Sequence, residues 1–173
     1  MLLMAVGTNP ASAAEIHPFI LYTAADIGHI TDQLSAEPYA AWLDGETQEA
    51  ETILAADVSW ELDDVPPATE AYYAKVLAFV YAFGGDAFEI RDQCAREAAL
   101  SLYHIPSNNY KNRFDSDLDI SEAVLFWAEA YDFLKGAGYG FDIEGYDNVE
   151  STIRGRMKSL RDYMARDTYS LFP

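Results

Sequence analysis

Apolar residues recur at intervals of three or four along almost the whole chain from Thr23 onward. This is the period of an α-helix with one buried face, and no stretch alternates over enough residues to indicate a strand. The pattern predicts six helices, at about 23–37, 38–57, 70–85, 86–105, 120–138 and 149–168. The fold class predicted from this pattern is therefore all-α.

Several local signals predict where these helices begin and end. Thr23 has the character of an N-cap, and Asp26 three residues later completes a capping box. Pro38 suits the first turn of the second helix, whose predicted anchors are Tyr39, Trp42, Ile53 and Leu54. The pair Pro66-Pro67 closes the loop before the third helix, and Gly84-Gly85 ends that helix.

Two helical hairpins repeat one plan, an apolar inner helix followed by an amphipathic outer helix. They span Glu70–Ile105 and Ile120–Thr168, roughly 45 residues apart. Stacked hairpins of this kind build solenoids and α/α barrels. We therefore expect stacked antiparallel helical hairpins that form part of an α/α toroid, an incomplete barrel, with the first two helices as an irregular opening pair.

The amino-terminal segment resembles the end of a secretion signal. "MLLMAVG" is apolar, and "ASA" before Ala14 has the small-x-small pattern of a cleavage site. We expect residues 1–14 to be the remnant of such a signal or a flexible tail, and residues 15–173 to be the helical unit. The expected location is secreted or periplasmic. No apolar run reaches the roughly 20 residues of a spanning helix, so no membrane insertion is expected after signal removal.

Charge and cysteine content narrow the possible partners. The 173 residues carry a net charge of −18, and no Lys or Arg precedes Lys75. Such a chain repels nucleic acid, which is therefore not an expected partner. The last 20 positions hold five basic residues, which we interpret as the solvated face of an outer helix: Arg154, Arg156, Lys158, Arg161 and Arg166.

Cys94 is the single cysteine and is predicted to be buried. No cofactor or metal is expected, because no ligand cluster or phosphate-binding glycine loop is recognisable.

Three stretches resemble the uronate polysaccharide lyases of the heparinase II/III and alginate lyase type. They are "HPFILYTAADIGHITDQLSAEPYAAWLD", "AKVLAFVYAFGGDAFEIRDQCAREAALSL" and "DISEAVLFWAEAYDFLKGAGYG". The resemblance extends from Glu15 to about Phe172 and is one of pattern rather than of catalytic signature. It implies an α/α toroid and β-elimination on glycans that contain uronic acids.

The resemblance also implies where the chemistry of such a lyase lies. Its Tyr, His and Asn-His residues would follow Pro173, so the chain is expected to be the amino-terminal portion of a longer lyase and inactive alone. No residue is assigned a catalytic role. His17 is interpreted as part of the segment that opens the folded unit, His29 as a surface residue and His104 as structural at a helix end.

One loop has the composition of an anionic sugar site. "SNNYKNRF" places cationic groups beside amides and an aromatic ring, and its candidate substrate-binding residues are Asn108, Asn109, Tyr110, Lys111 and Arg113. Guanidinium and ammonium groups suit a carboxylate, amides suit hydroxyls, and a ring suits a pyranose face. The alternative is an ordinary turn after Pro106, since Asn is favoured in turns.

Two further functions remain open from the sequence. The first is a non-catalytic helical-hairpin domain that binds a glycan or a protein. The second is the start of an α/α-barrel glycoside hydrolase, which needs two carboxyl groups that converge in a cleft. The candidate carboxylates are Glu129, Asp132, Asp63, Asp64 and Glu70. The lyase hypothesis instead predicts exposed apolar surface around Phe126, Trp127 and Phe172.

Overall fold

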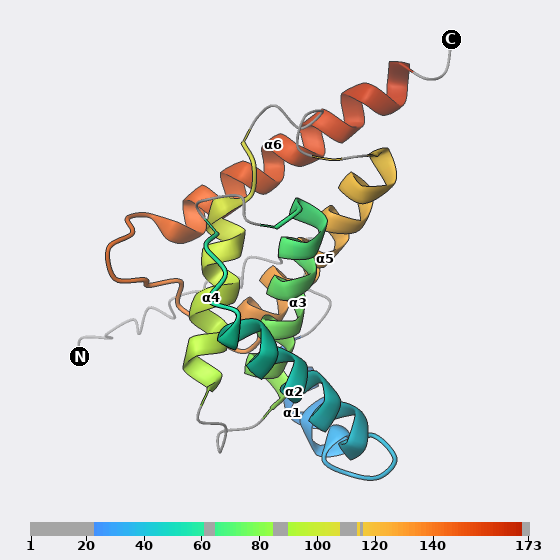
Figure 1. The fold of residues 1–173 in the computed structure, drawn as a ribbon, viewed down its shortest axis with the longest axis vertical. Helices are drawn as coiled ribbons and strands as arrows, with labels where there is room; N and C mark the ends of the chain where they lie inside the picture. The colour runs from blue at the N-terminus through green and yellow to red at the C-terminus, as the bar shows by residue number, and fades with distance from the viewer. Residues whose placement is uncertain (1–22, 61–64, 85–89, 108–113, 115, 171–173) are drawn as a thin grey trace, which may run out of the picture.

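The computed structural model describes residues 23–60, 65–84, 90–107, 114 and 116–170. Within these ranges the chain forms six α-helices and no strand (Figure 1). They are α1 (Ala24–Leu34), α2 (Ala40–Ala55), α3 (Pro67–Phe83), α4 (Arg91–His104), α5 (Asp117–Gly136) and α6 (Val149–Ser170). The all-α prediction and the order of the six helices are confirmed.

The helices form two adjoining rows, and α3 and α5 make one of them. Tyr72 lies against Phe126 and Phe79 against Phe133, the same step along both helices, so α3 and α5 run parallel. The second row consists of α2, α4 and α6, and α4 contacts both of the others. The α2 and α4 helices run antiparallel to α3. Along the chain, α3 of the first row is thus followed by α4 of the second row, and α5 is followed by α6.

Small residues allow the helices around α3 to approach closely. α3 is apolar on most faces, and Ala71, Ala74 and Ala78 are fully buried in it. Across from them, α4 buries Cys94 and three alanines that are also inaccessible: Ala95, Ala98 and Ala99. Small side chains at buried positions allow neighbouring helices to pack closely. The prediction that Cys94 is a buried core residue is confirmed.

A buried polar network connects α3, α4 and α5. The indole N–H of Trp127 donates to Ser101 Oγ at 3.4 Å, and this hydroxyl donates to the Glu70 carbonyl at 3.3 Å. Trp127 is 1% exposed, so the expectation that it would be exposed was wrong. It lies on the face of α5 that turns toward α4. Phe126 is half-buried, and Phe172 lies outside the described residues.

The start of α1 agrees with the prediction from the sequence, whereas the start of α2 does not. Thr23 and Asp26 form the predicted capping box, with Asp26 accepting from the Thr23 backbone at 2.8 Å. α2 begins at Ala40 with Tyr39 as its N-cap, so Pro38 lies before the helix rather than in its first turn. Trp42 packs against Phe79 of α3 at a centroid distance of 5.2 Å but remains 50% exposed, so it is not the buried anchor that the sequence predicted.

Tyr39, the other predicted anchor at this end of α2, is 54% exposed, and its prediction was also wrong.

α3 begins at Pro67, a favoured first helical residue, rather than at Glu70. It ends at Gly84, where a Cβ would lie 2.6 Å from the Val80 carbonyl oxygen. The glycine is therefore required by a close backbone approach, and its φ of −69° is that of an ordinary right-handed residue.

α6 is attached mainly through its first half. Val149, Ile153 and Leu160 are buried, and the Arg156 guanidinium donates to the Ile105 carbonyl at 3.2 Å beyond the end of α4. That guanidinium also lies over the Tyr103 ring. The rest of α6 runs out toward the C-terminus, away from α1 and α2 (Figure 1).

Candidate functional site

An open groove lies at the junction of α5 and α6. Its volume is about 1020 Å³, and charged, amide and aromatic side chains line it. The lining residues are Lys135, Phe141, Asp142, Tyr146, Asp147, Asn148, Val149, Glu150, Ser151 and Arg154. This groove is the candidate functional site, because mixed polar groups around an aromatic surface are typical of binding sites.

The link between α5 and α6 shapes the groove through four left-handed backbone positions. Gly138 and Gly145 have φ values of 82° and 86°, which glycine adopts without steric cost. Asn148 has a φ of 53° and ends the link, and its carbonyl accepts from the Thr152 N–H in the first turn of α6. Asparagine tolerates this conformation better than most residues.

Phe141 holds the same left-handed conformation at greater cost. Its φ is 53°, which is uncommon for a bulky side chain. The surrounding contacts hold it in place: the ring stacks on Tyr131 at 5.4 Å and meets the edge of Tyr139 at 5.2 Å. Strained residues that packing maintains occur preferentially at functional sites. The backbone conformation of Phe141 therefore favours a functional role for the link between α5 and α6.

Glu150 is the electrostatic centre of the groove. Its carboxylate accepts from the Tyr131 hydroxyl at 3.0 Å and pairs with the Lys135 ammonium at 2.8 Å. Burial alone would raise the pKa of Glu150, but the hydrogen bonds from Lys135 and Tyr131 outweigh it, and the pKa is lowered. Burial and the hydrogen bond to Glu150 raise the pKa of Tyr131. The carboxylate is thus charged and the phenol neutral at neutral pH.

Arg154 is the cation of the groove that is open to a ligand. It lies one turn after Glu150 on α6 and is exposed, and no hydrogen bond or ion pair engages it in the described part of the chain. Asp142, Asp147 and Asn148 are also exposed around it. A guanidinium binds a carboxylate through two parallel hydrogen bonds, while carboxylates and amides hydrogen-bond to hydroxyls. The arrangement of a guanidinium, carboxylates and an amide suits the binding of a polar or anionic ligand.

The loop residues proposed from the sequence as substrate contacts cannot be compared with this groove. Asn108, Asn109, Tyr110, Lys111 and Arg113 all lie outside the described residues, as does His17. His29 is exposed on α1 and lies 3.3 Å from Gln33, as expected of a surface residue. His104 is the last residue of α4 and packs edge-on against Tyr103 and Tyr146.

The carboxylates proposed for glycoside hydrolysis have different surroundings. Glu129 pairs with Lys75 at 3.0 Å, whereas Asp132 and Glu70 are 2% and 1% exposed. Asp63 and Asp64 lie outside the described residues. Glu129, Asp132 and Glu70 are also absent from the lining of the open groove. The three described carboxylates that the sequence suggested for hydrolysis therefore lie outside this groove, and the carboxylates that do line it are Asp142, Asp147 and Glu150.

The sequence interpretation treated "YGFDIEGYDN" as a link only and so missed the groove. Two signals were present: alternation of aromatic and acidic residues, and an Asn directly before a helix start. Neither identifies a ligand, because Lys135 and Arg154 come from the two helices and join the link only in the folded chain.

Comparisons with known proteins leave the chain without an assigned relative. No family model matches the sequence, no curated protein matches it, and no solved structure matches the fold. No helix within the described ranges is both long and apolar enough to span a bilayer. Among the described residues, no three His, Cys, Asp or Glu side chains gather as metal ligands would.

Proposed function

We propose that this chain is the amino-terminal, substrate-binding portion of a secreted or periplasmic polysaccharide lyase that acts on uronate glycans. In this proposal the α5–α6 groove holds a segment of the glycan, and the residues that perform β-elimination are elsewhere in the lyase. The observation that carries the proposal is the exposed Arg154 guanidinium, without an ion pair in the described structure, beside an aromatic ring and an amide.

Arg154 would bind the carboxylate of a uronate unit. Lys135 is engaged by Glu150, which leaves the guanidinium as the available positive charge of the lining. A bidentate guanidinium–carboxylate pair is among the stronger charge-assisted interactions in proteins. The nearby Asp142 and Asp147 disfavour a polymer of dense negative charge, such as a polysulfate, and favour one with isolated carboxylates.

The remaining lining suits the other groups of a sugar. Tyr146 is half-buried at the groove and its ring presents an apolar surface, while Asn148 and the two aspartates supply partners for hydroxyls. The groove is open to solvent, and its volume of about 1020 Å³ lies at the upper end of small-molecule pockets, which leaves room for a polymer segment.

The arrangement of helices supports the fold that this proposal requires. A parallel inner pair, α3 and α5, lies beside an outer row of α2, α4 and α6, which is the layout of consecutive hairpins in an α/α toroid. Closure into a ring is part of the proposal, as is an extracytoplasmic location.

Isothermal titration with a uronate tetrasaccharide tests the proposal, with a neutral tetrasaccharide of the same length as the ligand control. Arg154→Gln should weaken uronate binding about tenfold or more, since loss of a charge-assisted pair of about 1.4 kcal/mol has that effect. Lys158→Gln is the matched control, because Lys158 is exposed one turn later on α6 and lies outside the groove.

Three results would contradict the proposal. The first is absence of uronate binding by the wild-type chain, and the second is equal loss of affinity in both variants. The third is ultraviolet absorbance of an unsaturated uronate product from the chain alone, which would show that its own residues perform the chemistry.

A further inference from the structure

The two ends of this molecule differ in charge. Between Asp26 and Glu51, which cover α1 and α2, the chain has seven acidic residues and no Lys or Arg. The outer part of α6, from Lys158 to Ser170, carries three basic residues and two acidic ones. α1 and α2 lie at one end of the molecule, and the C-terminal half of α6 extends from the other (Figure 1). These two surfaces therefore cannot meet within one chain.

The acidic end presents two exposed aromatic side chains. Tyr39 is 54% exposed and Trp42 is 50% exposed, one helical turn apart at the start of α2. Large aromatic residues that are half in solvent are typical of interface anchors. Asp44, Glu46 and Glu49 follow on the next turns of α2, so carboxylates continue directly from the aromatic pair.

The Trp42 ring is fixed before any partner arrives. Phe79 lies behind it with a centroid distance of 5.2 Å, and Phe79 itself packs against Phe83 and Phe133. A preorganised anchor loses little conformational entropy on binding, which favours its use in an interface.

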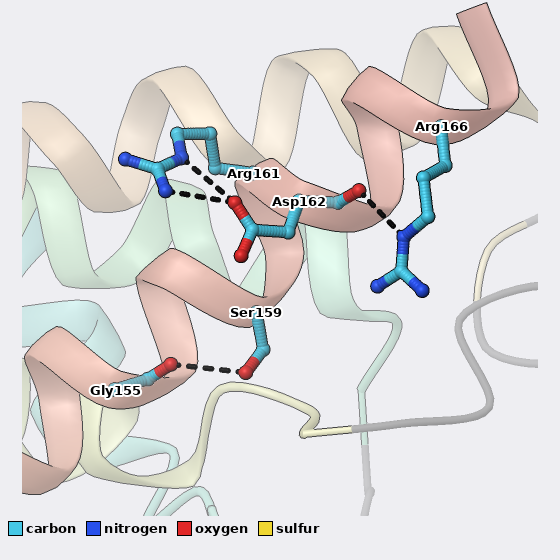
Figure 2. Close-up of polar contacts among 5 residues, drawn as sticks. All are labelled: Gly155, Ser159, Arg161, Asp162 and Arg166. Atoms are coloured by element: carbon cyan, nitrogen blue, oxygen red, sulfur yellow. Dashed lines mark hydrogen bonds and ion pairs between the residues drawn. The ribbon is translucent and has the colours of Figure 1, made fainter.

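The opposite end presents cations on the outer part of α6. Lys158, Arg161 and Arg166 are exposed there. Figure 2 shows the Arg161 guanidinium donating twice to the Asp162 carboxylate, at 2.7 and 3.1 Å, and Arg166 Nε donating to the Asp162 carbonyl at 3.0 Å. These local bonds orient the arginines while the Arg161 side chain remains 60% exposed.

We propose that copies of this chain associate head to tail, with the outer part of α6 of one copy docked on the Tyr39–Trp42 end of α2 of the next. The arginines meet the carboxylates of α2, and a guanidinium lies over the exposed indole, which is the aromatic ring that best attracts a cation. Because the two surfaces differ, the interface is heterologous and repeats into rings or open chains.

The net charge of −18 does not prevent this contact at physiological ionic strength. Charges separated by more than the Debye length, about 8 Å, are largely screened, so repulsion between the distant acidic surfaces is reduced. Opposite charges in direct contact at the interface are screened less. The association should therefore weaken steadily as salt is raised further.

Sedimentation velocity of the purified full chain over a range of concentrations measures the association. The wild-type chain should show a mass that grows with concentration beyond two copies. Trp42→Ala removes the acceptor surface, and Arg161→Gln/Arg166→Gln removes the donor surface, so each variant alone should remain monomeric. Mixing the two variants should restore one intact interface and give a one-to-one dimer that grows no further.

Arg96→Gln is the matched control for the loss of an arginine charge, since Arg96 is exposed on α4 and belongs to neither surface. It should associate like the wild type. Trp42→Gln, checked by circular dichroism, replaces Trp42→Ala if the alanine variant is unfolded. A monomeric wild type, assembly of either variant alone, a mixture that stays monomeric, or assembly that strengthens as salt is raised above physiological ionic strength would each overturn the proposal. None of these variants alters the glycan groove.

Discussion

The buried hydrogen bond between Trp127 and Ser101 gives a quantitative test of the packing between α4 and α5. Trp127 is the largest fully buried side chain among the described residues, and its N–H has Ser101 Oγ as acceptor at 3.4 Å. The same hydroxyl donates to the Glu70 carbonyl at 3.3 Å, so one serine satisfies groups of both neighbouring helices. The perturbations are Ser101→Ala, Trp127→Phe and the double variant.

The expected magnitudes follow from these contacts. Ser101→Ala leaves a buried indole N–H without its acceptor, which costs about 1–3 kcal/mol in general. We expect about 1 kcal/mol, at the low end of that range, because both hydrogen bonds are long. Trp127→Phe leaves a cavity and should cost about 2 kcal/mol, less than the roughly 3–5 kcal/mol of truncation to alanine. Each single variant loses the hydrogen bond between Trp127 and Ser101. The coupling free energy between the two changes should therefore be about 0.5–1 kcal/mol.

Urea unfolding followed by far-ultraviolet circular dichroism measures all four proteins, since that signal does not depend on the tryptophan itself. Linear extrapolation gives each free energy of unfolding. The double variant should be less destabilised than the sum of the single variants. Additivity within about 0.3 kcal/mol would refute the hydrogen bond as a source of stability. Ser159→Ala, at an exposed serine whose hydroxyl donates to the Gly155 carbonyl of its own helix, serves as the matched control and should change stability little.

Three further predictions concern the helix ends, the tyrosines and the charged pairs. Thr23→Ala removes the capping box of α1 and should cost about 1 kcal/mol locally, seen as faster amide hydrogen exchange in α1. Burial and the hydrogen bond to Glu49 raise the pKa of Tyr72 from 10.0 to about 12. The neutral phenol therefore stabilises the fold below pH 10, and this stability is lost as pH rises from 10 toward 12; Tyr72→Phe should remove a late step from the tyrosinate absorbance titration. Lys75→Met leaves the half-buried Glu129 without its ion-pair partner and should lower the unfolding free energy by about 1 kcal/mol, a loss that adding Glu129→Gln should partly reverse.

The helices could be predicted from the sequence because their signals are local. The capping box at Thr23 depends on residues three positions apart, and the apolar repeat of α3 depends only on residues within that helix. The mostly apolar pattern of the third predicted helix likewise indicated that it would lie in the core. These features follow from backbone hydrogen bonding and side-chain period, which a single segment contains.

The candidate groove depended on distances that the sequence does not contain. Lys135 is in the last turn of α5 and Arg154 is on α6, and they line one groove because the link between the helices, with its left-handed positions, folds between them. The sequence instead directed attention to the loop from Asn108 to Arg113, which lies outside the described residues. Composition alone does not distinguish a loop that is rich in polar groups from one that brings them together.

Trp42 and Trp127 show most clearly what the sequence decided and what the tertiary structure decided. Both lie on helices with apolar repeats, so the sequence by itself determined that each belongs to a helix and that the protein is all-α. Only the tertiary structure decided that Trp127 is buried against α4 while Trp42 is half in solvent. The physical reason is that helix period defines a face within one segment, whereas burial depends on which neighbouring helix covers that face.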